Sequence, residues 1–265
     1  MKDYLRTRGV EFDAINLQSN PEGFEELKGR NIRTLPAISV GDRFINVDAF
    51  STKYRELDAL LGLGETAKAL IPGPELVDRA IFLLTAAMRY ARQLPRDRYE
   101  DKIPGMKGEP LRLNDGTLVR YPDGTPYVPH DTNIGLVRHI IGHGRKFEVI
   151  AKAPGAEGYD RIEKLAPLGE PDARSDLPEI IAQGNQIVVG IRQWWDETRG
   201  RDLECEVNAV FGKNSLHEVL QGMTYGLAQH SRQLIHVLRA MDIEPIEPLT
   251  DAAYEGLNLP EVVWG

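Results

Sequence analysis

Cysteine is nearly absent from this chain of 265 residues, which contains a single one, Cys205. One thiol cannot form an internal disulfide and is typical of a reducing compartment. No apolar run approaches the roughly 20 residues that a membrane-spanning helix needs. The net charge is -8, and the sequence contains no run of basic residues. Both observations argue against binding along a nucleic-acid backbone. We therefore expect a soluble, cytoplasmic protein without nucleic-acid or membrane partners.

The first 63 residues predict a small domain in which helices and strands alternate. Apolar and polar residues alternate in residues 10–17, as in a half-buried strand, and Asn20-Pro21-Glu22 begins a helix with a capping residue and an early proline. The other expected elements are helices over residues 2–8 and 51–63 and strands over residues 34–40 and 43–46. Glycine and proline punctuate residues 63–74, which we interpret as a domain boundary.

Beyond this boundary the pattern predicts long helices. We expect them over residues 75–94, from Asp131 or Thr132 to about 152, from Ser175-Asp176 to about 198, and from Asn214 or Ser215 to about 241. The long connection 96–129 contains turn signals that suggest small hairpins. The expected domains are thus 1–64, a four-helix bundle over 74–242, and an apolar tail, 243–265, that packs on the bundle. Bundles of this kind place functional sites between facing helices.

The first domain resembles the glutaredoxins, a branch of the thioredoxin fold. The resemblance rests on Thr34-Leu35-Pro36, which matches the family's T-x-P turn, on the Gly41-Asp42 hairpin, and on the order of helices and strands. Together with the helices predicted beyond residue 74, this resemblance implies an α+β chain overall, with a small α/β domain before an all-α bundle.

This domain departs from the glutaredoxin pattern in two ways. The family begins with a strand and a C-x-x-C or C-x-x-S motif, where a helix N-terminus activates a thiol. The present sequence begins inside the helix that follows, and Asn46-Val47 replaces the glycine pair beside which glutathione binds; Asp48 lies close to a position that holds its amino group in some members. Cys205 stands between two glutamates that would raise its pKa. We therefore expect no disulfide exchange from these residues.

Two interpretations of the missing strand remain open. In the family that strand pairs on both sides, so its loss would break the hydrogen-bond ladder of the sheet. One hypothesis is that the natural chain starts upstream of Met1. The other is a remodelled three-stranded sheet that serves only for docking.

The second domain resembles the DinB-like four-helix-bundle proteins through residues 227–239, LAQHSRQLIHVLR. The last helix of that family carries two metal-binding histidines in an H-x-x-x-H pattern, followed by x-x-Q. His230 and Gln233 match the second histidine and the glutamine. Gly226 occupies the position of the first, so the resemblance implies a metal site that has lost one ligand.

The resemblance further implies a first metal ligand at His139, and His143 follows it one helical turn later. The expected metal ligands are therefore His139, His230 and His143, holding Zn, Ni or Fe. A metal-free site with packed histidines remains open as the alternative. His130, His217 and His236 are expected at the surface.

Other polar residues near these positions are candidates for binding an acidic substrate or glutathione. They are Arg138, Tyr225, Gln229, Arg232 and Gln233. The resemblance implies a metal-dependent thiol S-transferase or isomerase, with glutathione or a similar thiol as cofactor. The alternative is a non-enzymatic ligand-binding or assembly module without metal. A homodimer is compatible with either.

Overall fold

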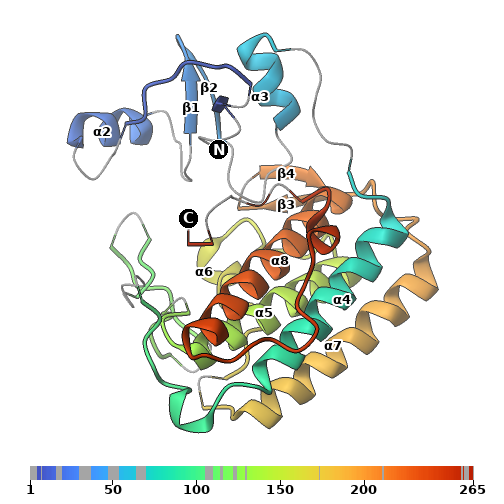
Figure 1. Ribbon diagram of the computed structural model, residues 1–265. Helices are drawn as coiled ribbons and strands as arrows, with labels where there is room; N and C mark the ends of the chain where they lie inside the picture. The colour runs from blue at the N-terminus through green and yellow to red at the C-terminus, as the bar shows by residue number, and fades with distance from the viewer. Residues whose placement is uncertain are drawn as a thin grey trace. The chain divides into compact units, whose positions relative to one another are not determined.

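The computed structural model divides the chain into two compact units, residues 1–68 and 69–265. It describes residues 5–6, 8–15, 20–29, 37–46, 54–63, 70–104, 110–113, 116–121, 124–128, 130–172, 174–210, 212–257, 259 and 263–264. Short strands and helices make up the first unit, and long helices dominate the second (Figure 1). The predicted α+β class is therefore confirmed.

The first unit contains a hairpin and two helices among its described residues. Strand β1 (Ala37–Val40) pairs antiparallel with β2 (Arg43–Asn46), as the turn between them predicted. Helices α2 (Pro21–Gly29) and α3 (Tyr54–Leu61) flank the hairpin in sequence. The guanidinium of Arg43 donates a 2.8 Å hydrogen bond to the Leu60 carbonyl, which ties the hairpin to α3.

The core of the first unit is small. Leu5, Ile45 and Leu57 are buried together, and Val10 and Phe12 pack against them. Residues 10–15 adopt no regular secondary structure, so the predicted strand was wrong there. The alternation of apolar residues signalled burial on one side, and an irregular segment satisfies that requirement equally well. The T-x-P turn at residues 34–36, Val47 and Asp48 lie outside the described residues.

Four long helices form the core of the second unit, as far as the structure describes it. Helix α5 packs against α7 and α8, and α4 packs against the same two helices (Figure 1). Their inward faces form one continuous apolar core. The helices are α4 (Gly73–Ala91), α5 (Asn133–Lys152), α7 (Leu177–Thr198) and α8 (Leu216–Ala240).

Side-chain caps start three of these helices, at the residues that the sequence indicated. The Thr132 hydroxyl accepts a hydrogen bond from the amide of Gly135 and starts α5. Asp176 and Ser215 each form a reciprocal capping box with the glutamate three residues later and start α7 and α8. These local signals therefore fix where the chain turns into helix.

The connection between α4 and α5 is ordered by short antiparallel bridges. Arg112 pairs with Leu118 and Arg120 pairs with Pro126, which confirms the predicted small hairpins. Val119 and Tyr127 are buried, so this connection packs into the unit rather than hanging from it. Tyr127 and His130 of this connection contact His139 of α5.

A second hairpin, β3 (Glu206–Ala209) with β4 (Gly212–Ser215), was not predicted. Because its last residue is the cap of α8, the helix signal covered the strand signal. Alternate residues of β3, Val207 and Ala209, are buried, and that alternation was the available clue. A helix of one turn, α6 (Ile162–Leu165), lies between α5 and α7.

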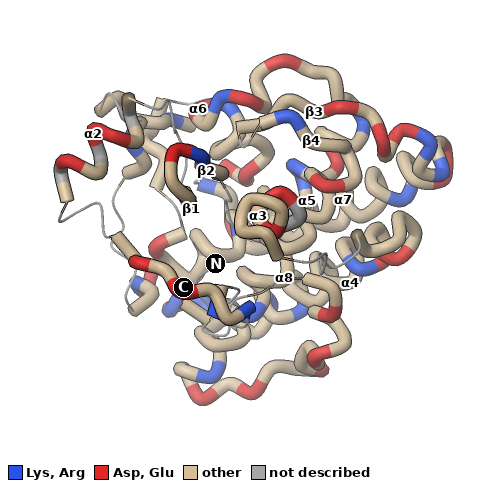
Figure 2. The backbone as a smooth tube through the Cα atoms, turned by 90° about the horizontal axis from the view of Figure 1, so that it is seen from above, with Lys and Arg blue, Asp and Glu red and all other residues tan. Residues whose placement is uncertain are grey.

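The segment after α8 packs back onto the helices. Leu257 belongs to the buried core, and the Tyr90 hydroxyl donates a hydrogen bond to the Glu247 carbonyl. Basic and acidic positions are interspersed along the described helices (Figure 2). Among the described residues, every helix is too short or too polar to cross a bilayer.

Candidate metal centre

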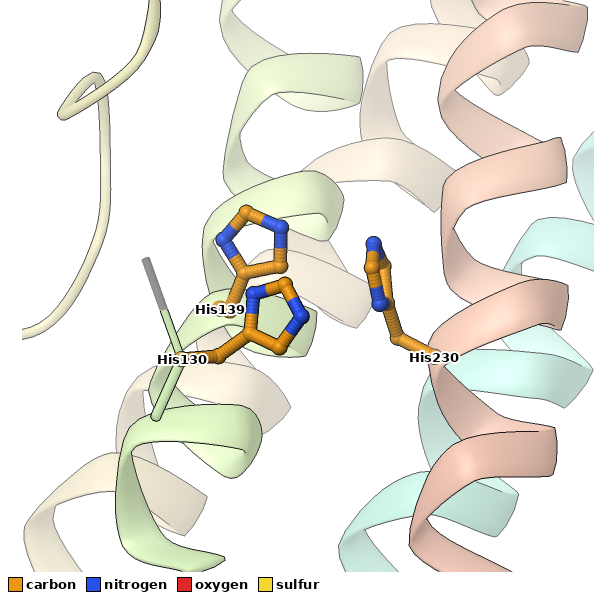
Figure 3. Close-up of side chains that lie close together, drawn as sticks. All are labelled: His130, His139 and His230. Carbon is orange, nitrogen blue, oxygen red and sulfur yellow. The ribbon is translucent and has the colours of Figure 1, made fainter. Parts of the chain in front are cut away.

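Three histidine side chains of the second unit lie close together. His139 projects from α5, His230 projects from α8, and His130 comes from the segment just before α5 (Figure 3). Each offers a ring nitrogen, and these three nitrogens all lie within 4.8 Å of one another. Within the described part of the chain, no other group of histidine, cysteine or acidic side chains converges in this way.

The rings also contact one another. The His130 ring stacks on that of His139 with 4.5 Å between centroids, and His230 meets His139 edge to face at 4.6 Å. His143 joins from the next turn of α5, 4.8 Å from His139 and 5.1 Å from His230. Four imidazoles therefore form a single cluster, of which three offer converging nitrogens.

His139 and His230, two of the three predicted ligands, lie in this cluster, and His130, which was not predicted as a ligand, lies there too. The expectation that His130 is a surface residue was wrong, because the connection before α5 folds back and half-buries the ring. His143 lies beside the expected site but outside the set of three converging histidines. His236 is exposed, and His217 Nε2 hydrogen-bonds the Ile71 carbonyl at 2.7 Å, away from the cluster. The only sequence clue to His130 was its nearness to the start of α5.

Gly226 matters for the room that it leaves. A β-carbon at this position would stand 2.5 Å from two atoms of the His143 ring. Real β-carbons do not approach so closely, so the bare glycine backbone makes space for that imidazole. His143 of α5 thus lies directly against the α8 backbone at residue 226.

Burial keeps these imidazoles neutral. It lowers the pKa of His139, His143 and His230 well below the ordinary value, and the neighbouring imidazoles and Lys146 lower each further. Burial also lowers the pKa of His130, although Glu170 opposes the shift. Neutral imidazole is the form that binds metal ions, so all four rings are ready to do so near pH 7.

A hydrogen-bond chain fixes the tautomer of His230. The Gln233 amide nitrogen donates to the Val263 carbonyl at 3.2 Å, which turns the amide oxygen of Gln233 toward His230 Nδ1, 2.7 Å away. An amide oxygen can only accept, so Nδ1 carries the proton. The lone pair of His230 therefore resides on Nε2.

His130 offers a nitrogen that nothing in the described chain satisfies. Its Nδ1 atom is buried and has no hydrogen-bond partner there. A buried polar atom without a partner is costly, and such atoms often mark a missing ion or water. One imidazole nitrogen from each of His130, His139 and His230 makes up a donor set of the kind that binds zinc.

The candidate substrate residues fall into two groups. The amide nitrogen of Gln229 donates to the Val263 carbonyl at 2.7 Å, and its oxygen accepts from Arg232 at 3.2 Å. Arg232 also lies over the Tyr254 ring. Gln229, Gln233 and Arg232 therefore hold the C-terminal segment against α8.

Arg138 and Tyr225 form the second group. One guanidinium nitrogen of Arg138 donates to the Ser175 carbonyl at 3.1 Å, while its Nε is buried without a partner among the described residues. Tyr225 is half-buried, and burial raises the pKa of its hydroxyl while Arg232 lowers it. Their roles in substrate binding stay predictions.

Cys205 is half-buried and unpaired with another cysteine. Burial raises the pKa of its thiol, and Asp202 raises it further. The direction agrees with the sequence-based expectation, but the carboxylate responsible is Asp202 rather than the two adjacent glutamates. A thiol with a raised pKa is a weak nucleophile near neutral pH.

Comparison with known proteins adds one finding. Residues 1–45 match the glutaredoxin family model. No curated protein and no solved structure matches the chain. The match covers the first unit in part and supports the thioredoxin-type interpretation of it; it contains no cysteine.

Proposed function

We propose that the second unit binds one divalent transition metal through His130, His139 and His230 and uses it in thiol chemistry. The observation that carries the proposal is the convergence of three imidazole nitrogens within 4.8 Å. Zn–N bonds of about 2.0–2.1 Å place tetrahedral ligands about 3.4 Å apart. Small rotations of the side chains would therefore close the set around an ion.

Three protein ligands leave at least one position open, which is the pattern of catalytic rather than structural zinc sites. A metal held there supplies a Lewis acid that lowers the pKa of a thiol or water in the open position. Neutral histidines leave its positive charge intact, since no carboxylate ligand offsets it.

The glutaredoxin match of residues 1–45 supports a small thiol of the glutathione type as the second component. In the proposed reaction the thiol loses its proton to solvent, and its sulfur attacks an electrophilic carbon of the substrate. A new C–S bond forms, and the electron pair of the broken bond departs with the leaving group or the opened double bond. The resemblance of residues 227–239 to DinB-like proteins supports the same reaction class, a thiol S-transferase or isomerase.

Metal analysis tests the first part. The purified chain, stripped with a chelator and reloaded with Zn²⁺ or Co²⁺, is expected to retain one equivalent. His130→Ala, His139→Ala and His230→Ala should each lose it, while His236→Ala, an exposed histidine outside the cluster, should not. Retention by all three cluster variants, or no binding by the parent chain, would overturn the metal site and favour the metal-free binding module.

Titration of the Co²⁺-loaded protein with glutathione tests the second part. Coordination by sulfur adds an intense charge-transfer band in the near ultraviolet and shifts the visible d–d bands. An S-methylated glutathione is the matched control, because it lacks the ionisable thiol. A spectrum unchanged by glutathione would contradict thiol binding while leaving the metal site intact.

A further inference from the structure

Glu170 is a carboxylate buried deep beside the histidine cluster. It lies in the segment between α6 and α7, and only 3% of its side chain is exposed. Gly142 of α5 makes room for it, since a β-carbon there would stand 2.4 Å from the Glu170 Cγ. A buried carboxylate is costly unless several groups stabilise it, so its partners indicate why it is held there.

The partners of Glu170 surround both of its oxygens. Oε1 accepts a 2.8 Å hydrogen bond from the Tyr127 hydroxyl and lies 2.7 Å from His139 Nδ1. Oε2 accepts a 3.1 Å hydrogen bond from the Tyr121 hydroxyl. The ammonium of buried Lys146 lies 3.9 Å from Oε1. Four side chains thus hold the carboxylate in position.

This geometry dictates the tautomer of His139. A carboxylate bonded to two tyrosine hydroxyls accepts from the imidazole, so the proton of the neutral ring resides on Nδ1. The lone pair is then on Nε2. Burial and Glu170 raise the pKa of Tyr127, so its hydroxyl keeps its proton and donates it to the carboxylate. The Tyr127 oxygen lies 3.4 Å from His139 Nδ1, a longer contact than the 2.7 Å that joins this nitrogen to Glu170.

We infer that Glu170 is the positioning residue of His139: it holds the ring by Nδ1–H and thereby presents Nε2 as a ligand. Metal-binding histidines commonly have such a carboxylate partner, which orients the ring and increases its basicity. The effect on metal binding rests on the proposed function, whereas the effect on the tautomer does not. Tyr121 bonds the far oxygen of Glu170, whereas the Tyr127 hydroxyl contacts both Glu170 and His139.

The tautomer can be measured in the metal-free protein. The ¹⁵N chemical shifts of the two ring nitrogens, with their long-range couplings to the ring protons, distinguish Nδ1–H from Nε2–H. The unaltered protein is expected to show Nδ1–H at His139. Glu170→Ala should shift His139 toward Nε2–H, the usual tautomer of free imidazole side chains, and Glu170→Gln should restore Nδ1–H because the amide oxygen still accepts.

Glu170→Ala leaves Lys146 without its buried counter-charge, which endangers folding. Glu170→Ala combined with Lys146→Met removes both charges and provides the second variant. His139 in the Nδ1–H form in a folded Glu170→Ala or double-variant protein would overturn the inference. A purely structural role for Glu170 would lower the melting temperature without changing the tautomer.

Competition of Co²⁺ against a chromophoric chelator supplies the metal readout. Loss of an outer partner of a ligating histidine typically weakens metal binding about 10–100-fold. Glu170→Ala is expected to weaken binding within that range and to alter the d–d bands. Tyr121→Phe should weaken binding much less, because it removes the hydrogen bond to Oε2 and leaves the contact between Oε1 and His139. An unaltered Kd in Glu170→Ala would overturn the positioning role. Failure of the parent chain to bind Co²⁺ would instead sink the proposed function and leave the tautomer result standing.

Discussion

The ring of His143 lies against the backbone of Gly226, so close that a β-carbon on residue 226 would stand 2.5 Å from two of its atoms. His143 is 4% exposed and Gly226 is buried, so neither partner can move into solvent. The bare backbone of α8 at residue 226 therefore makes room for an imidazole from α5.

Gly226→Ala should destabilise the second unit by about 1–3 kcal/mol, the usual cost of overpacking a tight core. His143→Ala removes the obstructing ring, so the second substitution should cost less in that background. Urea unfolding of the four proteins of the double-mutant cycle measures the coupling. Strictly additive free energies of unfolding would contradict the direct contact.

His143→Ala should keep one equivalent of metal, because His143 lies outside the three converging histidines. His130→Ala should lose it. Elemental analysis of the two variants after identical reloading makes the comparison. The opposite pattern would move the site to His139, His143 and His230, the set that the sequence alone suggested.

The stability of the metal-free protein should fall as the pH is lowered. Burial lowers the pKa of His139, His143 and His230 below 6.5, the value of an unperturbed histidine. Below pH 6.5 the unfolded chain therefore binds protons that the folded chain does not, so the stability present above pH 6.5 is progressively lost. Each histidine contributes up to about 1.4 kcal/mol per pH unit.

Chelator-treated protein unfolded by urea at pH 7.5 and at pH 5.5 provides the measurement. His143→Gln should reduce the difference between the two pH values, while His236→Gln, at an exposed position, should leave it unchanged. A free energy of unfolding that is the same at both pH values would contradict the burial of neutral imidazoles.

Gln233→Leu should weaken metal binding, because it removes the acceptor that keeps the proton of His230 on Nδ1. The expected loss is about 10-fold or more by the same reasoning as for other outer partners. Gln229→Leu is the matched control. It also removes a hydrogen bond to the Val263 carbonyl, but Gln229 is not the residue that bonds His230 Nδ1. Equal losses in both variants would assign the effect to the C-terminal segment instead.

Asp176→Ala should cost about 0.5–2 kcal/mol of stability through the loss of the α7 cap. Both hydrogen bonds of the capping box are exposed and join Asp176 to Glu179, so metal stoichiometry should not change. Thermal unfolding with and without metal separates the two effects. Loss of metal in this variant would link the α7 terminus to the site.

Much of the helical framework was predictable from the sequence, since it depends on local chemistry. A capping side chain accepts hydrogen bonds from amides only two or three residues away. The helix starts at Thr132, Asp176 and Ser215 could therefore be predicted from the neighbouring residues alone. The hairpin at Gly41-Asp42 is local in the same sense. These signals, with the matched glutaredoxin pattern, sufficed for the α+β class.

The predicted strand over residues 10–15 failed because a strand needs a hydrogen-bonding neighbour. Alternation of apolar residues indicates that one side of a segment is buried. Val10 and Phe12 are partly buried in this way against the core of Leu5, Ile45 and Leu57, without forming a strand. Whether a neighbouring strand edge exists is a property of the assembled unit. The alternation alone could not decide it.

His139 and His230 could be picked from the sequence by their place in predicted helices. His130 and Glu170 could not, because each reaches the cluster from an irregular segment whose path only tertiary packing sets. Glu170 is 31 residues from His139 in the chain, yet the two hydrogen-bond at 2.7 Å. The sequence by itself determined the helices and two histidines; the fold of the connections decided the third histidine, the carboxylate and the tautomer, because those depend on which distant groups share one buried space.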